Sequence, residues 1–202
     1  MDPEIRNINK FKITHKENSL EYFVIDRLVA PEELLWIYHT LIENESWSLS
    51  RTSKEINRGL IPFAGFPGMV IEENGSIMEP YISGWFKALV FRISYLLKKE
   101  YNFKLPTHIK RIHVGAKSSL SKTDTHIDSE NPDDWTILGF LNPIWNNKDG
   151  GEFNLNRKII RYTSGRFIIF PSFIPHDGGY IKNEKLNYWR ISSNIILTDK
   201  NK

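Results

Sequence analysis

The chain has 202 residues, which suits one domain, and no cysteine, which excludes disulfide bonds, iron–sulfur clusters and cysteine-ligated zinc. Its 27 Lys and Arg residues nearly balance its 24 Asp and Glu residues, and both signs are scattered, so no nucleic-acid partner is expected. Met1 to Lys12 contains no apolar signal-peptide core, and no apolar run approaches the roughly 20 residues that cross a bilayer. We therefore expect a cytoplasmic protein without a membrane partner, and the composition leaves its oligomeric state open.

Helices are predicted in the first half of the chain. One begins at Pro31, because proline suits the first helical turn and the following Glu32 and Glu33 suit the positive end of the helix dipole. A second is predicted from about Pro80 to Tyr101, where apolar residues recur on one broad stripe.

A glycine- and proline-rich stretch separates these helices. Ile56 to Gly75 is interpreted as loops, and Arg58 to Gly75 is a candidate lid that orders over a bound substrate.

Short β-type runs separated by turn sequences follow Pro106. The candidate strands are Lys110 to Val114, Trp135 to Leu141, Gly151 to Leu155, Arg166 to Phe170 and Tyr188 to Leu197. Such strands after helices favour a β-sandwich or jelly roll buttressed by helices. The prediction is one mainly β domain of the α+β class over 1–202, with helical N-terminal support over 1–105 and a jelly-roll core over 106–198.

His126, Asp128 and His176 are the candidate metal ligands. Residues two apart on a strand point to the same face with Cα atoms about 6.5–7 Å apart, so His126 and Asp128 can converge on one ion. His176, held between Pro175 and a Gly-Gly turn, supplies the third ligand. Two histidines and one carboxylate are the ligand set of non-haem iron(II) oxygenases. Zinc can occupy the same ligands, so the metal stays open at this point.

A candidate anion site lies on the last predicted strand. The alternation of side chains along a strand places Arg190, Ser192 and Asn194 on one face. It directs Trp189 to the other face, toward the core. An arginine beside a hydroxyl in an apolar pocket matches a carboxylate in bidentate geometry. The competing interpretation is an exposed edge strand with a structural ion pair.

The motifs together resemble the iron(II)- and 2-oxoglutarate-dependent dioxygenases, specifically their prolyl-hydroxylase-like branch. The resemblance covers roughly Lys110 to Leu197 and rests on an ordered set: His126-x-Asp128, Trp145, Gly150-Gly151-Glu152, Arg166 to Pro171, His176 and Arg190-x-Ser192. It implies a double-stranded β-helix, which is a jelly roll with the N-terminal helices packed against it.

The resemblance also implies roles for individual residues. His126, Asp128 and His176 would bind iron(II). Arg190 would bind the distal carboxylate of 2-oxoglutarate, with Ser192 as a hydrogen-bond partner. O2 would be the second cosubstrate, and ascorbate would assist turnover.

Two positions depart from the pattern of the branch. His113 stands where relatives often carry a tyrosine, and Phe140 stands where a second tyrosine often touches the cosubstrate. Both are therefore candidate cosubstrate contacts, and a buried structural role for His113 is an equal alternative. These departures weaken the assignment of proline as the substrate.

The expected reaction is hydroxylation of an unactivated C–H bond in an amino acid, a peptidyl residue (proline included) or a small metabolite, with release of succinate and CO2. Two alternatives remain. A cupin-like metalloenzyme would use the same metal ligands without 2-oxoglutarate, and a non-catalytic jelly-roll module would bind a partner without turnover.

Overall fold

The computed structural model describes residues 7–49, 67–119, 121, 124–183 and 189–199. The elements in chain order are β1 (Asn7–His15), β2 (Asn18–Asp26), α1 (Pro31–Ile42), β3 (Ser48–Leu49), β4 (Pro67–Glu73), β5 (Ser76–Ile77), α3 (Pro80–Tyr101), β6 (His108–Lys117), β7 (Trp135–Phe140), the 3-10 turn η1 (Asn147–Asp149), β8 (Phe153–Leu155), β9 (Lys158–Ile160), β10 (Phe167–Pro171), β11 (His176–Gly178) and β12 (Arg190–Thr198).

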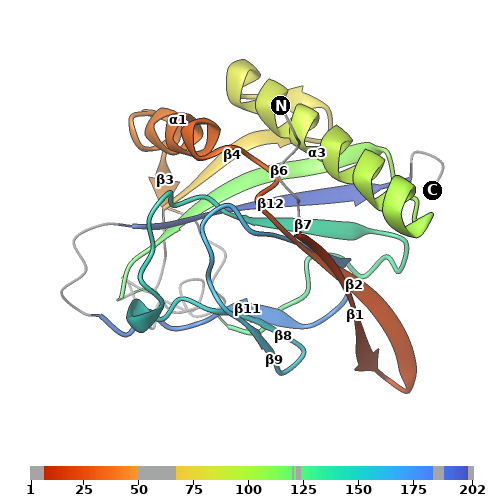
Figure 1. Ribbon diagram of the computed structural model, residues 1–202. Helices are drawn as coiled ribbons and strands as arrows, with labels where there is room; N and C mark the ends of the chain where they lie inside the picture. The colour runs from red at the N-terminus through yellow and green to blue at the C-terminus, as the bar shows by residue number, and fades with distance from the viewer. Residues whose placement is uncertain (1–6, 50–66, 120, 122–123, 184–188, 200–202) are drawn as a thin grey trace.

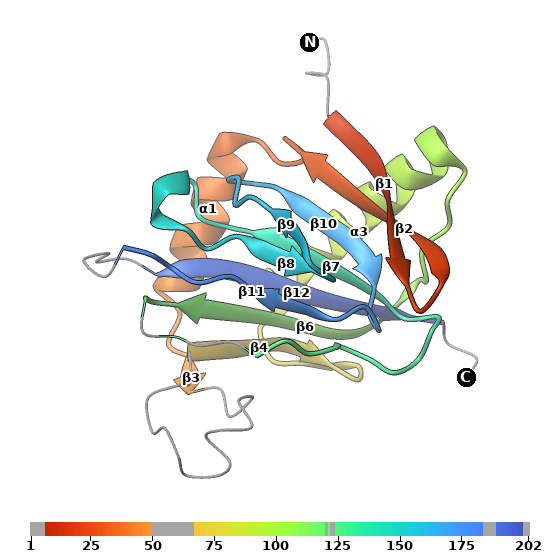
Figure 2. The same ribbon diagram turned by 90° about the horizontal axis from the view of Figure 1, so that it is seen from below.

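These strands form two antiparallel sheets. The larger, nine-stranded sheet has the order β1-β2-β10-β7-β12-β6-β4-β3, with β5 beside β4, and the smaller sheet has the order β11-β8-β9. The small sheet lies against one face of the large sheet, whereas α1 and α3 lie across the opposite face (Figure 1). Seen from below, β8, β9 and β11 cover the central strands β7, β10 and β12 (Figure 2). This arrangement is the expected jelly roll supported by helices.

Side-chain alternation along the central strands divides the interior into two cores. Phe167 and Ile169 of β10 join the core under the helices, whereas Ile168 and Phe170 join the core between the two sheets. The candidate site borders the second core, so the helices support the large sheet from the opposite face.

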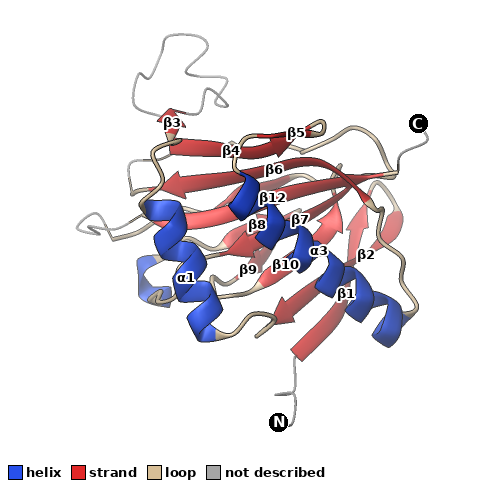
Figure 3. Ribbon diagram, turned by 90° about the horizontal axis from the view of Figure 1, so that it is seen from above, coloured by secondary structure: helices blue, strands red, loops and turns tan. Residues whose placement is uncertain are grey.

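Both predicted helices are confirmed. Proline occupies the first turn of α1 and of α3, and α3 ends at Asn102, whose left-handed φ of 52° terminates the helix. The helices lie on one face of the large sheet (Figure 3). They are joined through Glu33, whose carboxylate accepts hydrogen bonds from Trp85 (2.8 Å) and Arg92 (2.9 Å). In the described part of the chain, no helix has the length and apolarity needed to cross a membrane.

The N-terminal part over 1–105, predicted as helical support, also contains strands that were not predicted. Strand β2 pairs with β10 and thereby adds the hairpin of β1 and β2 to the large sheet. Asp26 at the end of β2 fixes this edge, because Arg166 donates to its two carboxylate oxygens at 2.7 and 2.8 Å. The interleaved charges of β1 are typical of an exposed edge strand, which is why its sequence did not indicate a strand.

The predicted lid is wrong over its second part. Residues 58–66 lie outside the described residues, and residues 67–73 form β4, which pairs with β6 in the large sheet. Met69 and Ile71 are completely buried in the core under the helices. Their burial against β6 gives this segment a structural role.

The five strands predicted after Pro106 are all present, with ends shifted by a few residues, whereas the short strands β9 and β11 were not predicted. Trp189 was predicted to point into the core, but it is 42% exposed. The ladder of β12 starts at Arg190, so Trp189 precedes the strand and alternation does not fix its direction.

Two glycines provide a matched test of packing. A Cβ on Gly139 of β7 would lie 2.6 Å from the Ser193 hydroxyl and 2.7 Å from the Phe167 ring, whereas a Cβ on Gly84 of α3 would meet nothing within 4 Å. We expect Gly139→Ala to lower the free energy of unfolding by about 1–3 kcal/mol through overpacking. Gly84→Ala should raise it by about 0.5–1 kcal/mol, because alanine favours a helix interior. Urea unfolding measures both, and equal effects of the two substitutions would contradict this packing.

Candidate functional site

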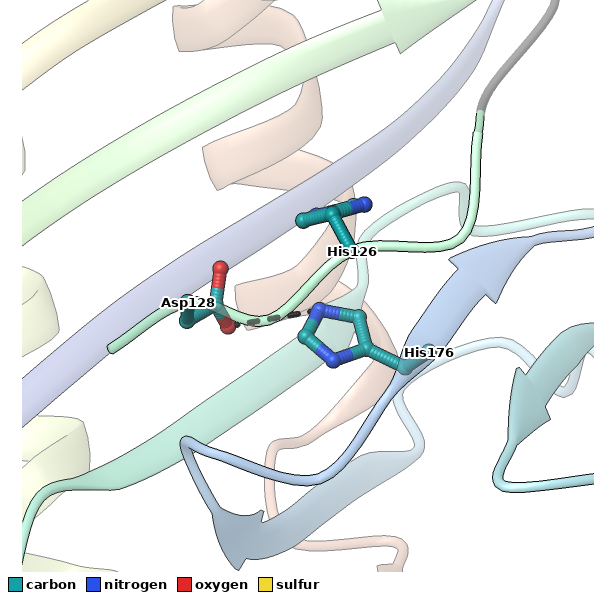
Figure 4. Close-up of side chains that lie close together, drawn as sticks. All are labelled: His126, Asp128 and His176. Carbon is teal, nitrogen blue, oxygen red and sulfur yellow. Dashed lines mark ion pairs between the residues drawn. The ribbon is translucent and has the colours of Figure 1, made fainter. Parts of the chain in front are cut away.

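The three candidate metal ligands come together beside the core between the sheets, where the His176 ring contacts Phe153 and Phe170. One ligand atom from each of His126, Asp128 and His176 lies within 4.8 Å of the others. The backbone holds them there, because the amide of His126 donates to the carbonyl of His176 and the reverse bond is also made, each at 2.9 Å. The amide of Asp128 donates to the carbonyl of Ser172 at 2.9 Å. Figure 4 shows His176 on β11 and the other two residues on the neighbouring segment, gathered around one space.

Hydrogen bonds orient both imidazole rings. Nδ1 of His126 lies 2.9 Å from the carbonyl of Asp124, and Nδ1 of His176 lies 2.8 Å from the carbonyl of Ile174. An Nδ1–H that donates to a carbonyl leaves Nε2 as the ligand atom. Burial lowers the pKa of His176, although Asp128 opposes this effect, so the neutral imidazole that binds a metal is favoured.

The carboxylate of Asp128 is held by residues of the large sheet. Its Oδ2 accepts hydrogen bonds from Thr136 of β7 (2.8 Å) and Asn194 of β12 (2.9 Å), and lies 3.4 Å from Nε2 of His176. Arg111 of β6 lies 3.7 Å from Oδ1. Hydrogen bonds and ion pairs of this kind fix the orientation of a carboxylate that binds a metal. The predicted face of β12 is thus correct for Asn194, which reaches the metal ligands.

Arg190 has the largest fully buried side chain among the described residues, with 1% exposure. Its guanidinium carbon lies 5.7 Å from the centre of the Phe140 ring and 5.5 Å from that of the Tyr162 ring. Its Nε and Nη1 have no hydrogen-bond partner among the described residues. Burial lowers the pKa of Arg190, and this shift is opposed by Tyr162 and Glu152. Buried donors without partners are costly, so this position is suited to an incoming anion.

Tyr162 was missed by the sequence analysis although it forms one wall of the Arg190 pocket. Its ring stacks on Phe140 at 4.2 Å between centres, and its hydroxyl donates to the side chain of Asn142 at 2.7 Å. Burial raises the pKa of this hydroxyl, so Tyr162 stays neutral beside the guanidinium. No motif marks Tyr162, because its contact with Phe140 arises only when the sheets face each other.

The remaining predicted residues lie beside the candidate metal ligands and the Arg190 pocket. Ser192 lies between Arg190 and Asn194 on the same side of β12 and pairs with Phe140 of β7. His113 pairs with Asn194 across the β6–β12 ladder, which puts it beside the candidate metal ligands. Burial, followed by the charge of Arg111, lowers the pKa of His113 to about 4, so the ring is neutral at pH 7. Contacts of Ser192, His113 and Phe140 with a cosubstrate stay predictions.

Solved structures share this architecture. A prolyl-4-hydroxylase from Pseudomonas putida superposes with a TM-score of 0.64 and 11% identity, over 88% of this chain and 92% of that chain. An oxidoreductase of the 2OG-Fe(II) oxygenase family from Burkholderia pseudomallei gives 0.62 and 14%, over 89% and 88%. The chain has the fold of the 2OG-Fe(II) oxygenases.

A third structure with this fold belongs to the prolyl-hydroxylase group. It is a prolyl hydroxylase from Trichoplax adhaerens in complex with a peptide of the hypoxia-inducible factor oxygen degradation domain, with a TM-score of 0.56 and 22% identity over 89% of this chain and 84% of that chain. Neither a family model nor a curated protein matches the sequence. The likeness therefore concerns the fold, and the double-stranded β-helix expected from the sequence is confirmed.

The contact between Asn194 and Asp128 generates a prediction for metal binding. We expect Asn194→Ala to weaken the binding of Fe(II) or Mn(II) by about 10–100-fold, because it removes a hydrogen bond that orients a ligand. Ser193→Ala is the control, since the Ser193 hydroxyl is buried on the other side of β12 and has no hydrogen-bond partner within the described part of the chain. Competition against a fluorescent chelator measures both affinities, and equal affinities of the two variants would refute the role of Asn194.

The low pKa of His113 predicts a pH dependence of stability. Between about 4 and its ordinary value of 6.5 the unfolded chain binds more protons at this residue, so acidification destabilises the fold. On acidification from pH 7 to pH 5, the free energy of unfolding of His113→Gln should fall by about 2 kcal/mol less than that of the wild type. Urea unfolding of the metal-free protein tests this, with His39→Gln on the exposed side of α1 as the matched control. Parallel pH profiles for His113→Gln and the wild type would contradict the prediction.

Proposed function

We propose that the chain is an iron(II)- and 2-oxoglutarate-dependent dioxygenase that hydroxylates an unactivated C–H bond of an amino acid, a peptidyl residue or a small metabolite. The observation that carries this proposal is Arg190, a buried guanidinium with two unpartnered nitrogen atoms among the described residues. It lies in the same inter-sheet space as two histidines and a carboxylate that can hold a metal.

The candidate metal ligands fit iron(II). Two imidazoles and one carboxylate leave coordination positions open for a cosubstrate and O2, and the hydrogen bonds at both Nδ1 atoms direct Nε2 inward. His126, Asp128 and His176 would hold the ion, which together with 2-oxoglutarate and O2 supplies the oxidising power for the C–H bond and releases succinate and CO2.

The surroundings of Arg190 fit the distal carboxylate of 2-oxoglutarate. A guanidinium can donate two parallel hydrogen bonds to a carboxylate, and charge-assisted pairs of this kind are strong in a buried site. Phe140 and Tyr162 exclude water on one side of the guanidinium. An anion at this position would satisfy donors that the protein itself leaves unsatisfied.

The spacing along β11 fits the length of a five-carbon keto acid. His176 and Gly178 are two residues apart on this strand, so their Cα atoms are about 6.5–7 Å apart and share a face. A Cβ on Gly178 would lie 3.0 Å from Nη1 of Arg190. The candidate metal ligand and the candidate anion site are thus one strand repeat apart, and the absence of a side chain at Gly178 leaves room for the guanidinium.

The two rival functions account for fewer of these features. A cupin-like enzyme that uses the same ligands without a keto acid leaves the burial of Arg190 unexplained. A non-catalytic jelly-roll module has no use for three ligands oriented by hydrogen bonds. The peptide bound to the Trichoplax adhaerens prolyl hydroxylase supports a peptide as one class of substrate for this fold.

Succinate formation tests the proposal. Protein purified without oxygen and supplied with Fe(II), ascorbate, 2-oxoglutarate and air should release succinate slowly even without a substrate. A panel of amino acids, proline-containing peptides and metabolites would then reveal stimulation. His176→Ala should abolish release, because a metal ligand is lost. If iron binds normally and no succinate forms, the cupin-like alternative replaces the proposal.

Arg190 has its own test. We expect Arg190→Met to raise the 2-oxoglutarate concentration needed for half-maximal turnover by at least about tenfold, because a charge-assisted contact is lost. The affinity for Mn(II) should stay that of the wild type. Unchanged dependence on 2-oxoglutarate in a folded Arg190→Met variant would remove Arg190 from the binding site.

A further inference from the structure

Helix α3 has a second apolar face on the side that points away from the large sheet. Its sheet-facing side carries the buried core residues Ile82, Phe86, Leu89 and Ile93. The opposite side carries an outer stripe of five exposed residues: Tyr81, Gly84, Ala88, Phe91 and Tyr95. A surface helix normally has one apolar face, and a helix that is apolar on both faces is normally buried on both.

The aromatic rings of the outer stripe expose much of their surface. Tyr81 is 90% exposed, Phe91 72% and Tyr95 59%. Because an aromatic side chain presents about 150–250 Å², the three rings together expose roughly 400 Å². Figure 3 shows that no other element of the described residues lies over the outer face of α3. A contiguous exposed patch of this size is typical of an interaction surface.

The spacing of the outer stripe indicates a helix as its partner. Its residues follow one another at alternating steps of three and four, which is the pattern of a coiled-coil seam. In an antiparallel pair of two copies of α3, Phe91 of each copy can face Ala88 of the other, and Tyr95 can face Gly84. A Cβ on Gly84 would meet nothing within 4 Å, so this position has room for a ring. Large side chains thus oppose small ones, and the stripe is complementary to itself.

The cations that flank the outer stripe do not oppose such a pair. Lys87 on one side of the stripe forms an ion pair of 2.9 Å with Glu72 of β4. Arg92 on the other side forms an ion pair of 2.9 Å with Glu33 of α1. Both charges are therefore neutralised within their own copy, which lowers the repulsion between two copies of the helix.

The ends of the helix carry opposite charges. Lys98 and Lys99 lie in the last turn of α3, whereas Glu79 immediately precedes its first turn. The antiparallel pairing brings the lysines of each copy to Glu79 of the other, and the twofold symmetry makes this contact twice. It also sets the two helix dipoles in opposition. Charge therefore favours a second, antiparallel copy as the occupant of the stripe.

We propose that the protein forms a symmetric homodimer in which the outer stripes of two α3 helices pack antiparallel. The three rings supply about half of the 800 Å² that each partner contributes to a standard interface, so we expect a dissociation constant in the micromolar range. The helices lie on the face of the large sheet opposite the small sheet (Figure 1), so both candidate sites stay accessible in the dimer.

Sedimentation equilibrium over about 1–200 µM protein tests the dimer. The mass should rise with concentration from 23.7 kDa toward twice that value. Phe91→Lys should weaken association by at least about 100-fold, because a symmetric interface loses the ring twice. Ile159→Lys is the matched control, since Ile159 of β9 is also 72% exposed but lies in the small sheet, and it should associate as the wild type does.

Cysteine cross-linking tests the antiparallel pairing. The chain has no cysteine, so introduced cysteines report alone. A mixture of Gly84→Cys and Tyr95→Cys proteins should form a disulfide-linked heterodimer on mild oxidation, because facing positions come within reach of a disulfide. Neither variant should cross-link by itself, since equivalent positions are about 16 Å apart along the antiparallel helices. Gly84→Cys mixed with Ile159→Cys should not cross-link.

Four outcomes would overturn the inference. These are a wild type that stays monomeric over the whole range, a dimer that Phe91→Lys does not weaken, a mixture of Gly84→Cys and Tyr95→Cys that gives no heterodimer, and a cross-link in either variant alone, which indicates parallel helices. The thermal unfolding and Mn(II) affinity of Phe91→Lys should match those of the wild type, which separates lost association from lost folding. The inference does not rest on the proposed function, so its failure would leave that proposal unchanged.

Discussion

The burial of a guanidinium between two sheets is the constraint on which the candidate site depends. Arg190 is enclosed by the rings of Phe140 and Tyr162 on one side and by the glycine backbone of β11 on another. The ring faces attract the cation without satisfying its N–H groups, because a π system offers little directional hydrogen bonding. The pocket therefore tolerates the charge and keeps its hydrogen-bonding capacity for another molecule.

Strand β12 links this pocket to the metal ligands. Arg190 begins the strand and Asn194, on the same face, donates to Asp128. The strand lies between β6 and β7 in the large sheet, so both of its edges are hydrogen-bonded and its register is fixed on each side. The distance between the candidate anion site and the candidate metal ligands is thus set by a central strand paired on both edges, as precise ligand placement requires.

The sequence predicts those parts of the fold and site that depend on local patterns. Helical spacing locates α1 and α3, and alternation places Arg190 and Asn194 on the correct face of β12. Prediction from the sequence fails where the structure depends on which strands pair. Tyr162 is far from Arg190 in sequence, and its contact with the guanidinium arises from the packing of the two sheets.

The errors near the N-terminus have the same origin. β1 is an exposed edge strand with interleaved charges, so its sequence lacks the apolar alternation of a half-buried strand, and β2 is recognisable as part of the large sheet only through its pairing with β10. β4 follows a glycine- and proline-rich stretch, and that composition outweighed the short apolar pattern of Met69 and Ile71. Whether such a segment forms a strand depends on pairing with a neighbouring strand, which the composition of the segment does not reveal.

Side chains alternate along β12, so odd-numbered residues pack in the core and even-numbered residues face the candidate site. Ile191 and Ile195 pack into the core under the helices, whereas Arg190 and Asn194 face the space between the sheets. Side-chain substitutions on one face can therefore accumulate with little effect on the other. A change in the length of the strand affects both faces, because inserting or deleting one residue would exchange them and turn polar side chains toward the core under the helices. The length of this strand is therefore more tightly constrained than the identity of any single side chain along it.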